Sequence, residues 1–288
     1  MYARNIVFNI KNKLMPCLSG KEAHDAIIAD LASNEPSMIA RFGAVEIKAM
    51  LYAILPPPVN ICFKTYTYTN FGRNAGFFPI DNKHLKKYGQ RMLMDMRELT
   101  TLASWRPEEI LLRKKLTDIP RIKLGEIGPV DTDYSWSKFL ENKKVLVVHP
   151  FAESIEAQYK KREYLFHNPN VLPEFASLQT IKAVQTIAGN NEKKFVDWFE
   201  ALSYMENQIE SKDFDIALIG CGAYGFCLAA AVKRMGKKAV HIGGPLQLYF
   251  GIKGKRWDNY GLYNDYWINP AQNERPSNLN LVENGCYW

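Results

Sequence analysis

A glycine-rich segment in the last third of the sequence has the spacing needed to bind a phosphate group. Residues 220–225 match the pattern G-x-G-x-x-G. Glycines let backbone N–H groups approach a phosphate, and the N-terminus of a following helix adds partial positive charge. An apolar run before the segment and an alanine-rich run after it are typical of a buried strand and a helix. We therefore expect a phosphate-bearing ligand at Gly220, Gly222, Tyr224 and Gly225.

The end of the second strand lacks one part of a dinucleotide-binding pattern. That pattern places an acidic residue there to bind a ribose, whereas this sequence continues with His241, Ile242, Gly243 and Gly244. An NAD(P)-dependent oxidoreductase is therefore the less favoured alternative. Close packing of the helix on its strand is another use of the glycines that the sequence leaves open. We keep His241, Gly243 and Gly244 as candidate ligand-binding residues because they end a strand.

A second group of candidates lies near the N-terminus, in residues 41–46, which spell R-F-G-A-V-E. Arg41 ends a predicted strand and Glu46 lies in the first turn of the next predicted helix, so the two are expected to lie close together. One interpretation is an ion pair, with Glu46 favoured by the helix dipole. The other is an arginine that faces a ligand and a glutamate that acts as a general base or binds a metal. The sequence leaves both open.

Two further candidates border a third predicted strand. His149 follows the apolar run of residues 144–148, and Ser154 lies in the first turn of the helix after it. A histidine at a strand end is either a structural residue or a group that faces the ligand. His149 and Ser154 do not complete a convincing hydrolase triad with Glu46, and no G-x-S-x-G, H-E-x-x-H or P-loop lysine pattern occurs.

The densest group of cations follows the glycine-rich unit. Lys253, Lys255 and Arg256 stand beside Trp257. Such a cluster is either a solvated face or a means of neutralising a diphosphate, with the tryptophan stacked on a base or sugar. We include the three cations among the candidate ligand-binding residues.

The elements that position these residues alternate along the chain. Strands are predicted at residues 38–41, 144–148, 216–219 and 239–242. Helices are predicted at residues 21–32, 44–54, 81–99, 108–116, 151–162, 193–211, 226–235 and 246–252, the first of them with a capping box at residues 19–22. The alternation predicts an α/β, Rossmann-like fold with a mostly parallel sheet and helices on both faces. Ligands bind such sheets at the C-terminal edges of the strands. This rule selects the loops at residues 42–46, 149–154 and 220–225 and the strand end at residues 241–244.

Other segments are less regular. Residues 60–78 are rich in Tyr, Thr, Phe, Asn and Gly and predict an irregular loop near the site. Residues 121–130 are ambiguous, and a strand is expected within residues 176–187. The tail from about residue 251 to residue 288 is expected to be irregular. No linker divides the sequence, so we expect residues 1–288 to form a single domain.

Composition limits the function classes. The chain has 288 residues, a formal charge of +7, 47% hydrophobic residues and five cysteines without a C-x-x-C pair. These features predict a cytoplasmic protein without a disulfide framework. The scattered cations suit an anionic ligand or loose attachment to the inner face of a membrane, and show no nucleic-acid-binding pattern. No apolar run approaches the about 20 residues of a membrane span.

Two of these motifs, taken together, resemble a known family. R-F-G-x-x-E after an early strand, with a late strand–glycine–helix–strand unit ending in H-I-G-G, resembles the GT-D glycosyltransferases. These bacterial enzymes have a Rossmann-like sheet and transfer a sugar from a nucleoside diphosphate donor to a growing glycan. Their early motif is typically R-F-G-D-G-E. Arg41, Gly43 and Glu46 match it, whereas Ala44 replaces the aspartate of its D-x-E element.

The resemblance implies a hexosyltransferase that acts in the assembly of a bacterial surface polysaccharide or glycoprotein. A UDP-sugar is the favoured donor, and a glycan or lipid-linked glycan is the acceptor. Glu46 would be the base, Arg41 and His149 would orient the substrates, and Gly43 and Ser154 would join the glycine turn around the donor. Without the aspartate, Glu46 alone is left to bind any divalent metal. A non-catalytic nucleotide-sugar-binding protein is a further alternative.

Overall fold

The computed structural model describes residues 2–189 and 194–288 of the chain. Within these residues, seven parallel strands form one sheet in the order β3-β2-β1-β7-β6-β4-β5. The strands are β1 (Ser37–Ala40), β2 (Thr101–Ser104), β3 (Arg121–Lys123), β4 (Lys144–His149), β5 (Ser177–Lys182), β6 (Ile216–Ile219) and β7 (Lys238–His241). The predicted α/β class with a Rossmann-like parallel sheet is confirmed.

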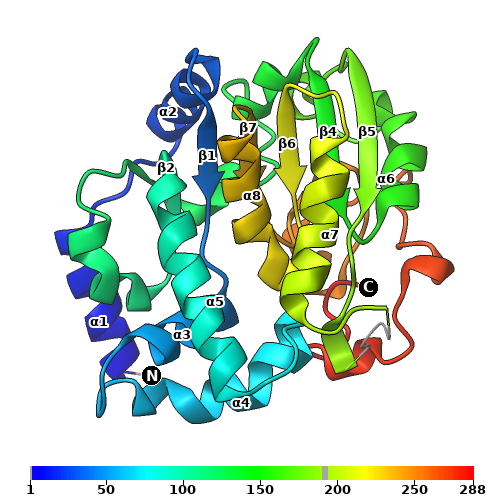
Figure 1. Cartoon of the computed structure of the whole chain (residues 1–288). Coiled ribbons are helices and arrows are strands. Elements are labelled where there is room, and N and C mark those ends of the chain that lie inside the picture. The colour runs from blue at the N-terminus through cyan, green and yellow to red at the C-terminus, as the bar shows by residue number, and fades with distance from the viewer. Residues whose placement is uncertain (1, 190–193) are drawn as a thin grey trace.

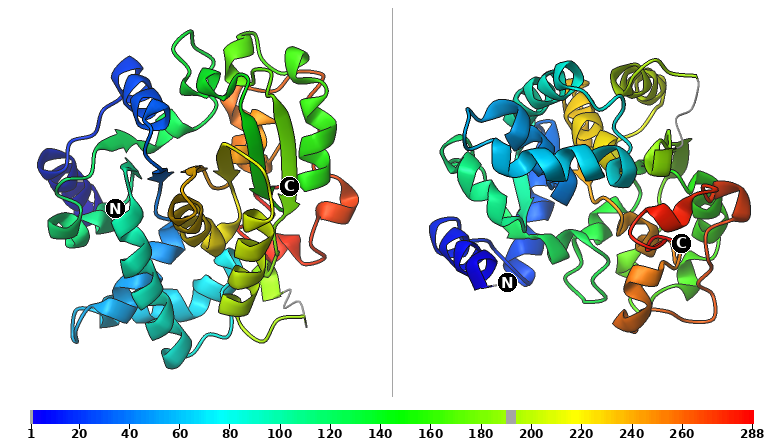
Figure 2. Two further views of the ribbon diagram at one scale, coloured as in Figure 1. Left: turned by 45° about the horizontal axis from the view of Figure 1, so that its top comes forward. Right: turned by 90° about the horizontal axis from the view of Figure 1, so that it is seen from below.

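Helices cover both faces of the sheet, and each face has its own hydrophobic core (Figures 1 and 2). Alternate strand residues point to opposite faces, as the pleat requires: Leu146 and Val148 belong to one core, Val145 and Val147 to the other. The first core holds α3 (Ala44–Ile54), α4 (Ile61–Ala75), α5 (Asn82–Asp95), α7 (Trp198–Glu210) and α8 (Gly225–Arg234). The second holds α2 (Lys21–Ala32), α6 (Ala152–Tyr159) and α9 (Leu246–Tyr249).

The unit β6–α8–β7 forms as the sequence predicts. Its two strands are neighbours in the sheet, and α8 lies between them in sequence and packs on both. The helix ends with Lys233 and Arg234 in its last turn, where cations favour the helix dipole. Gly236 follows with a φ of 77°, a left-handed conformation that glycine adopts without a steric penalty.

The bounds predicted for α2 and α3 agree with the structure, but the capping box at the start of α2 is wrong. The N-cap residue is Gly20, whose φ of 58° and lack of a side chain exclude side-chain capping. Its backbone N–H donates a hydrogen bond to Glu126 Oε1 at 3.0 Å instead. A carboxylate distant in sequence, and not a capping box, therefore bonds the backbone at this helix start.

The irregular loop predicted at residues 60–78 is also wrong, because α4 spans most of it. Its Asn, Thr and Tyr residues have weak intrinsic helix propensity, but Phe71 and Ala75 are buried in the core. Tertiary packing therefore outweighs propensity here. Gly76, with a φ of 80°, ends the helix.

Several other bounds differ from the prediction. The helix predicted at residues 81–99 is two elements, α5 and the short 3-10 helix η1 (Met96–Glu98), and β2 follows as a strand that was not predicted. The helix predicted at residues 108–116 is the 3-10 helix η2 (Pro107–Lys115). The helix predicted to reach residue 162 ends at Tyr159. The predicted start of α7 at Lys193 lies outside the described residues.

The strand expected within residues 176–187 is present as β5, and β3 resolves the ambiguous segment. The tail beyond α9 consists of short 3-10 turns, namely η9 (Lys255–Tyr260), η10 (Gln272–Glu274) and η11 (Leu279–Leu281). Before the first strand lies α1 (Tyr2–Leu14). No helix in the described part of the chain is both long and apolar enough to cross a membrane.

Candidate active site

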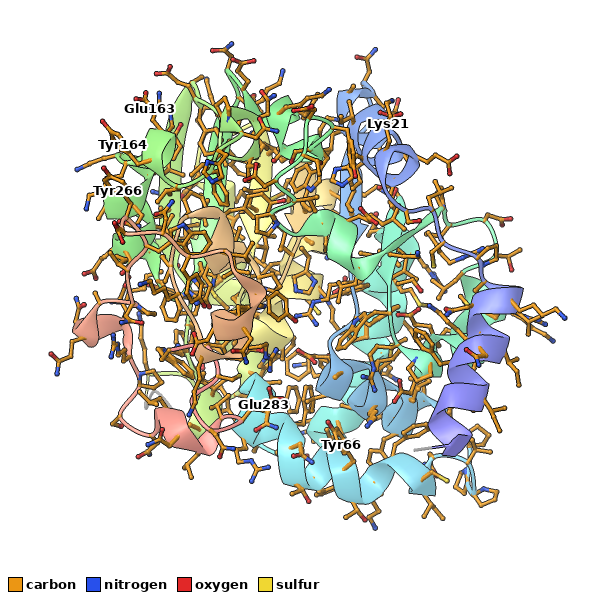
Figure 3. The ribbon with its side chains drawn as sticks, turned by 180° about the vertical axis from the view of Figure 1, so that it is seen from behind. Lys21, Tyr66, Glu163, Tyr164, Tyr266 and Glu283 are labelled. Atoms are coloured by element: carbon orange, nitrogen blue, oxygen red, sulfur yellow. The ribbon has the colours of Figure 1, made fainter. Side chains whose placement is uncertain are left out.

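A cavity of about 440 Å³ lies at the C-terminal ends of the strands. It is lined by residues at or within three positions of the ends of six of the seven strands: Arg41 after β1, Trp105 after β2, His149 at the end of β4, Val184 after β5, Gly220 after β6 and Gly244 after β7. The C-terminus of α4 and the C-terminal tail form the remaining walls. Figure 3 shows Glu283 of the tail at this edge of the sheet, over α4.

The cavity joins the two motifs that lie at opposite ends of the sequence. Glu46 of the early motif and Gly222 of the glycine turn both line it. The sheet order explains why, since β1 pairs with β7 and β7 pairs with β6. Only β7 separates β1 from β6, so the loops that follow these two strands open at the same edge of the sheet.

Arg41 brings positive charge into this cavity. Its Nη1 donates a weak hydrogen bond to Phe42 O at 3.4 Å, while its buried Nε has no hydrogen-bond partner. Within the described residues its guanidinium forms no ion pair. Gly243 has a φ of 77°, and a Cβ atom there would overlap the guanidinium. The absence of a side chain at Gly243 thus makes room for a cation that is available to an anionic ligand.

Glu46 lies half-buried in the first turn of α3 and lines the same cavity. Its Oε2 accepts a hydrogen bond from the backbone N–H of Val45 at 3.2 Å, which places the carboxylate at the helix N-terminus. The carboxylate folds back over Gly43 so closely that any Cβ atom at position 43 would overlap it. Gly43 therefore shapes the site through Glu46 and does not itself line the cavity. Arg41 and Glu46 share the cavity without pairing with each other.

His149 faces the cavity as a neutral hydrogen-bond donor. Burial lowers the pKa of its imidazole to about 3. Its Nδ1 accepts a hydrogen bond from the backbone N–H of Phe151 at 3.0 Å, so the single proton of the neutral ring sits on Nε2. A ring with so low a pKa is unsuited to act as a base near neutral pH, but its Nε2–H can orient a ligand oxygen.

His241 ends β7 but does not line the cavity. Burial, together with the nearby positive charge of Arg41, holds the pKa of its imidazole well below the ordinary value. Gly225, the first residue of α8, packs so closely on the ring that a Cβ atom there would overlap it. His241 and Gly225 are therefore packing residues behind the cavity wall.

Four residues of the glycine turn line the cavity, namely Gly220, Cys221, Gly222 and Tyr224. Gly220 also allows close packing, since a Cβ atom there would lie 2.6 Å from Gly243 O. Tyr224 stacks on Trp198 with 5.1 Å between ring centroids. The turn thus combines the two uses that the sequence leaves open, tight packing and access to the cavity.

Ser154 lies outside the cavity, where the N-terminus of α6 is occupied by a carboxylate of the tail. Glu274 Oε1 accepts hydrogen bonds from the backbone N–H groups of Glu153 and Ser154 at 2.8 and 3.2 Å. The Ser154 hydroxyl donates to Glu274 Oε2. The polar groups that were candidates for a ligand at this helix start are therefore bonded within the chain.

The basic cluster divides between the cavity and the surface. Arg256 lines the cavity, forms an ion pair with Glu283 and donates a hydrogen bond to the Tyr287 hydroxyl at 3.1 Å. Lys253 and Lys255 do not line it. The Lys253 ammonium lies 5.6 Å from the centroid of the Tyr263 ring. One of the three predicted cations therefore reaches the site.

Aromatic side chains that the sequence analysis did not select complete the cavity. Trp105 lines it and donates a hydrogen bond from Nε1 to Phe42 O at 2.7 Å. Tyr287 and Trp288 line it from the tail, with their rings perpendicular and 5.9 Å apart. The signal available in the sequence was weak, because Trp105 follows β2, a strand that was not predicted, and the tail has no periodic pattern. These rings can stack on a base or sugar.

The residues present do not fit a divalent metal bound by protein side chains. Ala44, which would have to be an aspartate for this segment to read R-F-G-D-G-E after one further change, lines the cavity and offers no metal ligand. The carboxylates in its wall are those of Glu46 and Glu283, and Glu283 pairs with Arg256. Among the residues that the structure describes, no three His, Cys, Asp or Glu side chains group as metal ligands would. Cationic side chains are the groups here that can meet a diphosphate.

A second cavity, of about 520 Å³, adjoins the first and shares Pro150, Val184 and Gln185 with it. Its lining includes three cations: Lys182, Lys194 and Arg275. The two cavities therefore lie next to each other, near the C-terminal ends of β4 and β5.

A solved structure of domain of unknown function 1792 superimposes with a TM-score of 0.51 at 13% sequence identity, covering 94% of this chain and 93% of that chain. The chain shares its fold. No protein-family model matches the sequence, and no curated protein matches it.

Two further solved structures are similar at lower scores. One is described as the highly conserved domain of unknown function 1792 with a distinct glycosyltransferase fold; it has a TM-score of 0.46 at 13% identity and covers 89% of this chain and 87% of that chain. The other is a new glycosyltransferase (DUF1792) from Streptococcus sanguinis, with a TM-score of 0.45 at 12% identity over 91% of this chain and 92% of that chain.

Proposed function

We propose that this protein is a glycosyltransferase that transfers a sugar from a nucleoside diphosphate sugar to a glycan in bacterial surface polysaccharide or glycoprotein assembly. One observation carries the proposal: an unneutralised arginine and a carboxylate from R-F-G-x-x-E meet the glycine turn in one cavity. The resemblance of that motif to the GT-D enzymes supports it. The fold that the chain shares with domain 1792 also supports it, because that domain is described as having a distinct glycosyltransferase fold.

The donor, a UDP-sugar in this proposal, has its diphosphate between Arg41 and the backbone of Gly220 and Gly222. Guanidinium and backbone N–H groups are strong donors to phosphate oxygens. Arg256 supplies a second cation at the far wall, partly neutralised by Glu283. The aromatic rings of Trp105 and Trp288 provide apolar surfaces for the base or the sugar.

In the proposed reaction Glu46, Arg41 and His149 each have one role. The oxygen of an acceptor hydroxyl attacks the anomeric carbon of the donor sugar, and its proton passes to the Glu46 carboxylate. The bond between that carbon and the diphosphate oxygen breaks, and the nucleoside diphosphate leaves with the developing charge stabilised by Arg41. His149 donates from Nε2 to an oxygen of the donor or acceptor.

The acceptor, a glycan or lipid-linked glycan, enters through the adjoining cavity. Lys182 there pairs with Glu153, and the remaining cations, Lys194 and Arg275, favour an acceptor that carries acidic sugars or a phosphate group. We place the reaction in the cytoplasm, where nucleotide sugars are available to a protein whose five cysteines are all free.

The direct test is sugar transfer, or donor hydrolysis, by the purified protein with a set of nucleoside diphosphate sugars. Glu46→Gln should lower turnover by about a hundredfold or more while leaving donor binding within a fewfold, because the amide keeps the shape and loses the base. Glu22→Gln is the matched control, since Glu22 lies in the first turn of α2 and far from the cavity lining. Full activity of Glu46→Gln would remove Glu46 from the mechanism.

Either of two other results would favour an alternative function. Binding of a nucleotide sugar with no turnover against any acceptor would indicate a non-catalytic binding protein, an alternative favoured by Ala44 in place of the aspartate. A thermal shift with NAD(P)H and none with UDP-sugars would indicate the oxidoreductase.

A further inference from the structure

The N-terminal helix α1 exposes its apolar residues and buries a lysine. Ile6, Val7, Ile10 and Leu14 are 41–46% exposed, whereas Lys11 is 1% exposed. Ile6, Ile10 and Leu14 follow each other at intervals of four residues and Val7 lies beside them, so they form one stripe along the helix. A helix that packs on a core normally shows the reverse arrangement.

The contacts of Lys11 explain this orientation. Its Nζ forms an ion pair with Glu109 Oε2 at 3.3 Å and donates a hydrogen bond to Ser104 Oγ. Glu109 is fully buried and also accepts a hydrogen bond from the backbone N–H of Trp105 at 3.1 Å. Because a buried carboxylate requires its partner, this pair fixes the rotation of α1 and keeps the apolar stripe turned outward.

Exposed cations lie on α1 and on the element that packs against it. The segment 2–14 contains no Asp or Glu, and Lys13 lies exposed in its last turn. The 3-10 helix η2 packs on α1 and carries exposed Leu111 on the same element as Arg113, Lys114 and Lys115, all three of them exposed. These four cations form no ion pair within the described residues. An apolar stripe with unpaired cations beside it is the surface that binds in the plane of an anionic membrane.

We propose that α1, together with η2, docks this protein on the surface of an anionic phospholipid bilayer. The stripe Ile6, Val7, Ile10 and Leu14 enters the boundary between head groups and acyl chains, and the neighbouring lysines and arginines contact lipid phosphates. A second copy of the chain is a poorer occupant, because a two-fold contact through this face would bring its cations against their own copies.

The docking surface connects to the cavity through a few bonds. Lys11 pairs with Glu109, Glu109 accepts from the N–H of Trp105, and Trp105 lines the cavity. Both surfaces therefore lie near the end of β2, at the C-terminal edge of the sheet. Docking goes beyond sugar transfer and does not depend on it, but it would place the cavity near a lipid-linked acceptor.

The test is co-sedimentation of the full-length protein with vesicles of phosphatidylcholine, with and without about a quarter of phosphatidylglycerol. We expect binding to the anionic vesicles that weakens as salt rises from about 0.05 to about 0.5 M. Ile10→Asp should weaken this binding by about tenfold or more, because it puts a charge in the apolar stripe. Leu281→Asp is the control: Leu281 is 55% exposed in η11, which lies across the molecule from α1 (Figure 2).

Three results would overturn the proposal: no binding to anionic vesicles, equal binding by the wild-type protein and Ile10→Asp, or a dimer in solution that Ile10→Asp converts to a monomer. Sugar transfer to a water-soluble acceptor should be unchanged in Ile10→Asp. Failure of membrane binding and failure of the proposed activity are therefore measured separately.

Discussion

The buried histidine at the end of β4 makes a quantitative prediction about acid stability. His149 is neutral in the folded protein because burial lowers its pKa to about 3, whereas its ordinary value is 6.5. The unfolded chain therefore binds a proton at His149 at about pH 5, and the folded protein does not. The stability due to neutral His149 is fully present above pH 6.5, and it is lost progressively as the pH falls from 6.5 toward 3.

The magnitude follows from the difference between the two pKa values. At about pH 5 the unfolded histidine is 1.5 pH units below its pKa, which lowers the free energy of unfolding by about 2 kcal/mol relative to about pH 7.5. His24 and His241 also have lowered pKa values through burial, so the total loss in the wild-type protein is larger. His149→Asn removes one titrating group and keeps an oxygen that accepts from the Phe151 N–H.

The assay is urea unfolding of the wild-type protein and His149→Asn at about pH 7.5 and about pH 5. The loss of stability between the two pH values should be about 2 kcal/mol smaller in the variant. His24 and His241 are present in both proteins and cancel in this comparison. An equal loss in the two proteins would show that His149 is protonated in the folded state, and its assignment as a neutral donor would be wrong.

Two further predictions concern the cavity. Gly243→Ala and Gly236→Ala both place a side chain at a φ of 77°, but only at Gly243 would the new Cβ atom overlap the Arg41 guanidinium. Gly236→Ala should lower the free energy of unfolding in urea by about 1 kcal/mol, and Gly243→Ala should lower it further because of the overlap. Only Gly243→Ala should also weaken nucleotide-sugar binding in calorimetry, by about tenfold or more. Equal affinities in the two variants would contradict the role given to Arg41. Ala44→Asp restores the second carboxylate of the D-x-E element, so Mn²⁺ should raise the melting temperature of this variant more than that of the wild-type protein, and equal shifts would show that position 44 does not face a metal site.

The elements that could be predicted are those whose signals are local. The buried runs of β4 and β6, and the alanine-rich α8 with Gly236 after it, carry their signals in consecutive residues. Because ligands bind parallel sheets at the C-terminal edges of the strands, Arg41 and Gly222 were predicted to lie together, although they are far apart in sequence. Predicting that these two residues lie close together required only the correct strands and a parallel sheet.

The elements that could not be predicted depend on contacts distant in sequence. The helix α4 forms from residues of weak helix propensity because Phe71 packs in the core. Ser154 looked free for a ligand because nothing local shows that Glu274 bonds to it. Trp288 enters the cavity from a tail without periodicity, so its position follows from tertiary packing alone.

The pairing of β1 with β7 has a consequence for how this protein reaches its native state. Ser37 pairs with Lys238, so the two halves of the cavity come together only when the chain closes a loop of most of its length. Contacts of such high sequence separation form late and slowly in folding. A donor analogue that bridges Arg41 and Gly222 would bind only molecules that have completed this closure. After dilution from urea, the rate at which its fluorescence or heat signal appears would then measure how fast β1 pairs with β7.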